Sequence, residues 1–416
     1  MGRSGTLRPE SYHFMRKTKI SIYFNLFLFL SFFLVNISHA QEIIADKDSF
    51  PNLLQDIGLQ GEIDDAINNM YNYNFVAAEV EFNWMRHRYP GHALPYFELA
   101  LGYWWRIAPN PDNEEYDKIF LAYLDTTIQK SYKALKKYPE NTEAAFFLAA
   151  AYGFKGRLYA ERKAWTKSAL AGKNALKYLR RNKNDIGLSP EFLFGEGLYN
   201  YYSVWIPANY PSLKLITMFF SKGDKKLGLE QLTEVSKNAF YTRTEGLYFL
   251  MRIYANEEKM PQLSYKIADQ LHKQYPNNPY FHRYYAMSQF LQSNTLESVR
   301  SSMDLLAKVE SKVFGYEEVS GRYASYFLGY ANLGTNEAEA GKYFKKTIDF
   351  AEKTKELDSG YYQSALQYLA DFAKKRKDFS TAKIYMDKIA KNNSQKKARK
   401  KARKEAKNLE KMKDED

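Results

Sequence analysis

Apolar side chains recur every three or four positions between residues 50 and 392. This spacing places them on one face of an α-helix, whereas a half-buried strand would alternate apolar and polar side chains. Tyr-Pro, glycine or asparagine clusters end the apolar blocks, and no Asn-Gly or Asp-Gly hairpin signal separates β-rich runs. The pattern therefore predicts an all-α body built from successive helices.

Three blocks share one layout, in which a helix ends at a Tyr-Pro pair and another begins shortly after it. Proline ends a helix because it lacks an N–H group and clashes with the preceding turn. The spacing from the proline to a Leu-Ala or Tyr-Ala pair in the next helix is identical in all three blocks. The Tyr-Pro pairs are Tyr89-Pro90, Tyr138-Pro139 and Tyr275-Pro276, and the helical face before the first consists of Phe75, Ala78, Phe82 and Met85.

This layout resembles the tetratricopeptide repeat (TPR), in which a large–small pair and a tyrosine on one helix pack against an alanine and an aromatic residue on the next. Two later pairs resemble it again, at residues 326–344 and 366–389. The resemblance implies an α-solenoid of six to eight TPR-like helix hairpins that form a right-handed superhelix with a concave binding surface. It covers most of residues 64–392. The stretch 156–240 does not keep the period, and it is either a specialised insert or a set of diverged repeats.

The first forty residues have the pattern of a secretory signal. Basic residues precede an apolar run at 20–35, and Ser38-His39-Ala40 offers small residues on either side of a bulkier one. We expect residues 1–14 to be an upstream extension, 15–40 to be a cleaved signal peptide, and 41–392 to form the repeat domain. The alternative is an uncleaved membrane anchor, although the apolar run is short for a span of about twenty residues.

The positive charge is concentrated at the C-terminal end. The formal net charge is +13, of which +6 lies in residues 391–416. Residues 393–416 are therefore expected to form a basic tail, either an exposed helix or a disordered arm. It could bind anionic lipid or envelope polymer, at about 1 kcal/mol per basic residue near a membrane, bind nucleic acid, or only aid solubility. Nucleic acid is the weaker alternative for an exported protein. The tethering candidates are Lys396, Lys397, Arg399, Lys400, Lys401, Arg403 and Lys404.

An aromatic-rich segment lies between residues 195 and 224. Tyr199, Tyr202, Trp205 and Tyr210 are the candidate ligand- or partner-binding residues in it. They could line a peptide or glycan groove or touch a membrane surface. Alternatively the segment is a kinked helix pair whose rings belong to the core, which is the more common role of an aromatic stripe at helical spacing. Prolines at 207 and 211 are expected to break the helix there.

No arrangement of residues characteristic of an enzyme occurs in the sequence. Phosphate-binding glycine loops, a Gly-x-Ser-x-Gly elbow and a His-Glu-x-x-His helix are all missing. We expect His87 and His92 to lie on the surface beside a turn, and the acidic pairs at 114–115 and 257–258 to be solvated. The chain has no cysteine, so disulfides, thiolate metal sites and an acylated lipoprotein anchor are excluded.

Composition does not narrow the function further. Hydrophobic residues make up 45% of the 416 residues, with 35 Tyr and 28 Phe, enough for a large helical core. The resemblance therefore leads to the hypothesis of an exported, non-enzymatic scaffold of the bacterial cell envelope without a cofactor, which binds other proteins on its concave face. The alternative is a carbohydrate- or peptidoglycan-binding protein that uses the aromatic residues around 199–220. An enzyme built on a helical toroid is a distant third.

Overall fold

The computed structural model describes residues 51–181, 189–209 and 222–415, with side chains up to residue 412. Within these ranges the chain forms seventeen α-helices and no strand, which confirms the predicted all-α class. The helices fall into two compact units. The N-terminal unit contains the described residues up to 257 together with 269–278. The C-terminal unit contains 258–268 and the described residues after 278. The predicted signal peptide lies outside the described residues.

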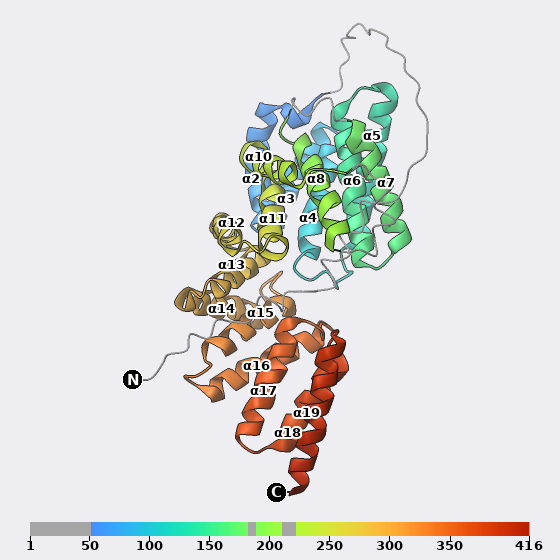
Figure 1. Cartoon of the computed structure of the whole chain (residues 1–416). Helices are drawn as coiled ribbons and strands as arrows, with labels where there is room; N and C mark the ends of the chain where they lie inside the picture. The colour runs from blue at the N-terminus through green and yellow to red at the C-terminus, as the bar shows by residue number, and fades with distance from the viewer. Residues whose placement is uncertain (1–50, 182–188, 210–221, 416) are drawn as a thin grey trace. The chain divides into compact units, whose positions relative to one another are not determined.

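The N-terminal unit begins with a short 3-10 helix and ends near a π-helical turn (Figure 1). Its elements are η2 (Leu53–Gln55), α2 (Ile57–Tyr71), α3 (Phe75–Arg88), α4 (Leu94–Ile107), α5 (Asp117–Lys137), α6 (Thr142–Glu161), α7 (Trp165–Arg181), α8 (Phe192–Asn209), α10 (Lys225–Asn238), α11 (Arg243–Arg252) and η5 (Ile253–Glu257). The next helix, α12 (Pro261–Gln274), contributes residues to both units.

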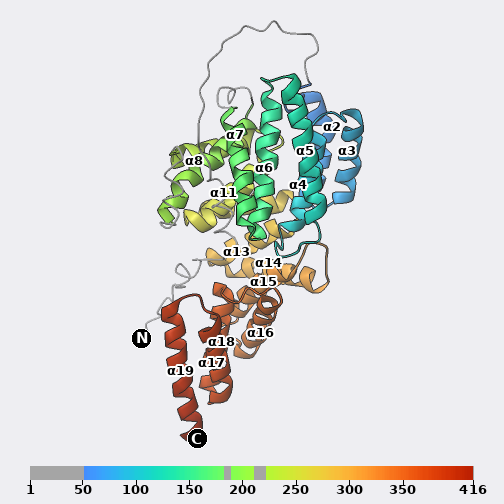
Figure 2. The same ribbon diagram turned by 90° about the vertical axis from the view of Figure 1, so that its right-hand side faces the viewer.

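The remaining helices build the C-terminal unit. They are α13 (Pro279–Leu291), α14 (Thr295–Glu310), α15 (Glu318–Ala331), α16 (Glu337–Lys353), α17 (Gly360–Lys375), α18 (Phe379–Asn392) and α19 (Lys396–Glu415). Helices α16 to α19 lie side by side in both views (Figures 1 and 2).

Each helix packs mainly on its neighbours along the chain, the arrangement of an α-solenoid. Alternate helices also touch each other directly: α2 meets α4, α4 meets α6, and α6 meets α8. In the C-terminal unit α13 meets α15 and α15 meets α17. We call these helices, together with α11, the inner helices of their units. The helices between them are the outer helices.

Tight turns join the two helices of a hairpin. In four of these turns a residue other than glycine adopts the left-handed conformation, namely Tyr73, Lys163, Ser293 and Lys377, with φ between 56° and 66°. This conformation lets the chain reverse in a few residues but costs a residue with a side chain roughly 1–2 kcal/mol. The buried contacts between the helices must offset that cost.

The predicted helix ends are confirmed at all three Tyr-Pro pairs. Helix α3 ends at Arg88, α5 at Lys137 and α12 at Gln274, each one residue before the tyrosine. The four side chains expected on one face of α3 are all buried. The later pairs expected from the TPR-like pattern correspond to α15 with α16 and α17 with α18.

A break in the helix was expected between Pro207 and Pro211, and the described part of α8 ends inside that range. Helix α8 contains Pro207 and continues to Asn209. A proline in the last turn removes one backbone hydrogen bond without ending the helix at once. Residues 210–221, where the second proline lies, are outside the described part of the chain.

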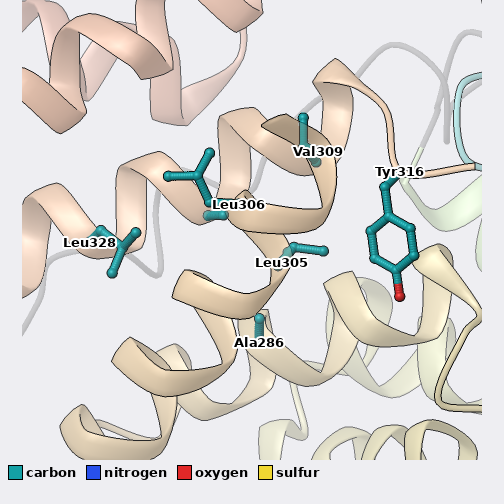
Figure 3. Packing of buried hydrophobic residues seen from close by; sticks show 7 residues of the cluster. Ala286, Leu305, Leu306, Val309, Tyr316 and Leu328 are labelled. Carbon is teal, nitrogen blue, oxygen red and sulfur yellow. The ribbon is translucent and has the colours of Figure 1, made fainter. Parts of the chain in front are cut away.

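One hydrophobic cluster of the C-terminal unit lies between α13, α14 and α15 (Figure 3). It contains a tyrosine beside aliphatic side chains, all at most 8% exposed: Ala286, Leu305, Leu306, Val309, Tyr316, Ala324 and Leu328. Burial of each large aliphatic side chain contributes about 1.5–3 kcal/mol.

Candidate functional site

The last elements of the N-terminal unit contact the first ones. The Tyr71 hydroxyl in α2 donates to Glu245 Oε1 in α11 at 3.3 Å, across 174 residues of sequence. The Asn278 amide donates to the Tyr71 carbonyl at 2.8 Å, and the Tyr241 hydroxyl donates to the Leu53 carbonyl at 3.2 Å. These contacts join the first and last elements of the unit. The inner faces of its helices therefore surround a common space.

That space is a cavity of about 140 Å³ with predominantly apolar walls. Four inner helices, α4, α6, α8 and α11, supply most of the lining, and α7, η2 and residues 241–242 supply the rest. Phenylalanine rings form much of the wall, and the polar groups that reach it are few. The polar side chains in the lining are Glu98, Arg157, Tyr241, Thr242 and Glu245.

Glu98 lines the cavity from α4 and has no hydrogen bond or ion pair among the described residues. Its side chain is only 2% exposed. Its pKa is raised to about 8, mainly by burial and further by the nearby Glu191 and Glu245 carboxylates. Glu98 therefore holds its proton near neutral pH unless a cation comes close to it.

Glu245 lines the same cavity from α11 but is partly satisfied. Its Oε1 atom accepts hydrogen bonds from Trp105 Nε1 at 2.9 Å and from the Tyr71 hydroxyl at 3.3 Å. Its Oε2 atom is buried and has no partner among the described residues. Burial raises the pKa of Glu245 to about 7, whereas Arg157 and the two hydrogen bonds oppose the rise.

Arg157 brings the one basic side chain to the cavity lining. Its guanidinium carbon lies 4.1 Å from the centre of the Trp104 ring, and the group also donates to the Tyr248 hydroxyl. Burial tends to raise the pKa of Tyr248, but Arg157 and Arg252 outweigh it and leave that pKa lowered. An aromatic face and a phenol thus both contribute to holding the guanidinium.

Two other buried carboxylates in this unit have plain structural roles. Glu143 accepts the backbone N–H groups of Leu53 at 3.2 Å and Leu54 at 2.8 Å, and so holds η2. Glu191 accepts three consecutive N–H groups at 240–242, just before α11. Carboxylates at such positions satisfy backbone donors that a helix cannot pair by itself. Glu98 satisfies no such donor.

The C-terminal unit carries a row of partly buried tyrosines on its inner helices. Tyr284, Tyr323 and Tyr361 lie on α13, α15 and α17, and Tyr330 and Tyr368 follow seven residues later on α15 and α17. The Tyr323 and Tyr361 rings lie 5.0 Å apart, and the Tyr330 and Tyr368 rings 6.4 Å apart. We call these five residues the tyrosine row.

The aromatic residues proposed from sequence lie mostly inside the protein. Tyr199 and Tyr202 are buried, and the Tyr202 hydroxyl donates to Glu257 Oε1 at 3.1 Å. The half-buried Trp205 ring packs 6.2 Å from that of Tyr202. Tyr210 is outside the described residues. The two buried rings therefore pack within the unit.

The basic tail is helical and partly packed. One side of α19 lies against α18 and buries Ala402, Ala406 and Leu409. The basic residues occupy the other side, where all of the tethering candidates are exposed except the half-buried Arg399. Lys374 of α17 further holds α19 through Glu405 at 2.6 Å.

Two predictions of surface exposure were wrong. His92 is 2% exposed, because its Nδ1 atom accepts the Leu94 N–H at the start of α4 and its ring lies beside Glu143. Glu257 is partly buried, since it ends the π-helical turn and accepts the Tyr202 hydroxyl. His87 is exposed, as expected.

The cavity carboxylates were missed at the level of sequence. Glu98 stands between Phe97 and Leu99 in the apolar helix α4, and Glu245 precedes a short apolar run in α11. An acidic residue within or beside an apolar run of a helix was the available signal, because such a group is seldom buried without a purpose.

Comparison with known proteins identifies no relative. No protein-family model matches the chain, and no curated protein matches it significantly. None of the helices in the described ranges is both long and apolar enough to cross a membrane.

Proposed function

We propose that the chain is a non-enzymatic interaction scaffold of the bacterial cell envelope. In this proposal it is exported through the signal at 15–40, its TPR-like hairpins form a right-handed superhelix, and it binds segments of other envelope proteins. The observation that carries the proposal is the tyrosine row on the inner helices of the C-terminal unit.

The chemistry of the row suits an extended peptide. A tyrosine offers a flat apolar face and a hydroxyl group, and few of its torsions are lost on binding. The five rings recur from hairpin to hairpin, so a peptide that runs along the inner helices would meet one or two of them at each step. Ring contacts such as that between Tyr326 and Tyr361, at 4.6 Å, hold part of the row in place before a partner arrives.

The exposed side of α19 supports the envelope location. Its basic residues face away from α18, so they are available to anionic lipid or cell-wall polymer. The buried alanines and Leu409 keep this helix attached to the unit that carries the tyrosine row. The tail would then tether the scaffold without needing to unfold.

Carbohydrate binding through residues 199–220 remains the alternative, with less support. A sugar stacks on an accessible ring face, whereas Tyr199 and Tyr202 are 7% and 3% exposed. Trp205 alone among the described candidates is partly accessible.

The test is site-specific photo-cross-linking in the native cells. A photoreactive phenylalanine analogue replaces Tyr330 or Tyr368, and a control carries it at Ile384, an exposed position on outer helix α18. We expect one or a few defined envelope proteins to be captured from the tyrosine row and not from α18. The double variant Tyr330→Ala/Tyr368→Ala should then reduce co-purification of the same proteins with the affinity-tagged chain.

Equal capture from both faces would contradict the proposal, as would recovery of the same proteins with the double variant. Captured cell-wall fragments in place of proteins would favour the carbohydrate alternative.

A further inference from the structure

We infer that the cavity of the N-terminal unit is a binding site for a small apolar molecule that carries one protonated amine, with Glu98 as its counter-ion. This inference concerns a site and a ligand class different from those of the proposed scaffold. It stands or falls independently of what the tyrosine row binds.

The size and walls of the cavity set the apolar part of the ligand. A cavity of about 140 Å³ is close to the volume of an apolar protein cavity that accepts a benzene-sized molecule, about 150 Å³. Phe97, Phe147, Phe154 and Phe249 contribute aromatic surface to the wall. Such rings favour an aromatic or compact aliphatic ligand, and their faces also attract a cation.

The charges around the cavity set the polar part of the ligand. Glu245 already accepts hydrogen bonds from Trp105 and Tyr71, and the positive charge of Arg157 lowers its pKa. Glu98 has no hydrogen-bond or ion-pair partner in the described structure. The neighbouring charged groups that shift its pKa, Glu191 and Glu245, are carboxylates and raise that pKa. One additional positive charge would complement Glu98, because Arg157 lowers the pKa values of Glu245 and Glu161 and is not among the groups that shift the pKa of Glu98. An ammonium group at Glu98 would form a charge-assisted hydrogen bond shielded from water.

An anionic ligand fits the same groups less well. It would meet two carboxyl groups in the wall, and the guanidinium of Arg157 is already engaged by Trp104 and Tyr248. A purely structural role for Glu98 also leaves its position unexplained. Glu143 and Glu191 each hold backbone N–H groups, whereas Glu98 holds none.

Gly153 provides an independent means of closing the site. It lines the cavity from α6, and a Cβ atom added there would have no heavy atom within 4 Å. A leucine at this position should therefore fill the space without a clash at its first carbon. Gly61 in α2 is equally open but does not line the cavity, so it provides a matched control in another helix.

The experiment compares benzylamine with benzyl alcohol, a neutral probe of the same size, by isothermal titration calorimetry on the full chain. We expect benzylamine to bind more tightly than benzyl alcohol by about ten- to a hundredfold, the range for a hydrogen bond to a charged group. Glu98→Gln should abolish that preference and leave the weaker binding of benzyl alcohol. Gly153→Leu should abolish binding of both probes, and Gly61→Leu should bind as the unaltered chain does.

Circular dichroism and tryptophan fluorescence establish that each variant is folded before its affinity is compared. The inference is overturned if neither probe binds, if the two bind equally, or if folded Glu98→Gln keeps the preference for the amine. Binding of benzylamine to Gly153→Leu with unchanged affinity would place the probe outside the cavity and overturn it as well.

Discussion

Glu98 should make the N-terminal unit less stable as the pH rises through neutrality. The pKa of its carboxyl is raised from an ordinary 4.5 to about 8 in the folded chain, mainly by burial. Between these two values the folded state keeps the proton and the unfolded state releases it. The stabilisation that goes with the proton is complete below about pH 4.5 and is lost as the pH approaches about 8.

The magnitude follows from the same two values. Each pH unit between them changes the free energy of unfolding by about 1.4 kcal/mol. From about pH 5 to about pH 7 Glu98 should therefore reduce the stability by about 2–3 kcal/mol. Glu245, whose pKa is raised to about 7, acts in the same direction and remains in the variant described next.

The variant Glu98→Gln keeps the size of the side chain and removes its titration. We expect the unaltered chain to lose about 2–3 kcal/mol more than Glu98→Gln over this pH interval. Tryptophan fluorescence during urea unfolding measures the right unit, because all five tryptophans lie between residues 84 and 205. Glu115→Gln, at an exposed loop position, is the matched control and should follow the unaltered chain.

Two outcomes would refute the reasoning. If stability falls with pH in parallel for the unaltered chain and Glu98→Gln, the carboxyl does not carry a raised pKa in the folded state. If Glu98→Gln is instead the steeper of the two, Glu98 gains a stabilising cationic neighbour as it ionises.

Three further substitutions test the packing. Gly153→Ala should raise the stability of the N-terminal unit by about 0.5–1 kcal/mol, measured by urea unfolding. Alanine favours a helix interior, and the new methyl group meets open space. A loss of stability would mean that the cavity is occupied. Gly329→Ala should lower the stability of the C-terminal unit by about 1–3 kcal/mol, measured by circular dichroism. The new methyl carbon would lie 2.7 Å from the Phe344 ring. An unchanged stability would show that the ring can move away. Glu356→Gln should lower the stability of the C-terminal unit by about 3–5 kcal/mol in the same assay, because the buried Arg322 guanidinium loses its carboxylate at 3.0 Å. A loss of stability below about 1 kcal/mol would show that water reaches Arg322.

The two units use the same hairpin arrangement in different ways. In the N-terminal unit the contacts of Tyr71 with Glu245 and of Asn278 with Tyr71 close the inner face around a cavity. In the C-terminal unit the inner helices present partly buried tyrosines instead. A small molecule suits the first arrangement and an extended peptide suits the second.

The sequence by itself determined the helical class, the hairpins and many of their ends. Apolar spacing identifies a helix because a helix repeats every 3.6 residues, and proline stops it through the geometry of its own ring. Both effects are local, so α3, α5 and α12 end where the Tyr-Pro pairs predict. In the tail, Ala402, Ala406 and Leu409 recur every three or four positions, and they lie on the buried face of α19.

Only the tertiary structure decided which polar residues are buried together. Glu98 and Glu245 look like ordinary acidic residues in two separate helices, and their environment depends on how the unit closes between α2 and α11. The burial of His92, Tyr199 and Tyr202 depends in the same way on contacts with other parts of the chain. Desolvation and pKa are properties of the surroundings in space, whereas helical periodicity is a property of neighbours in sequence.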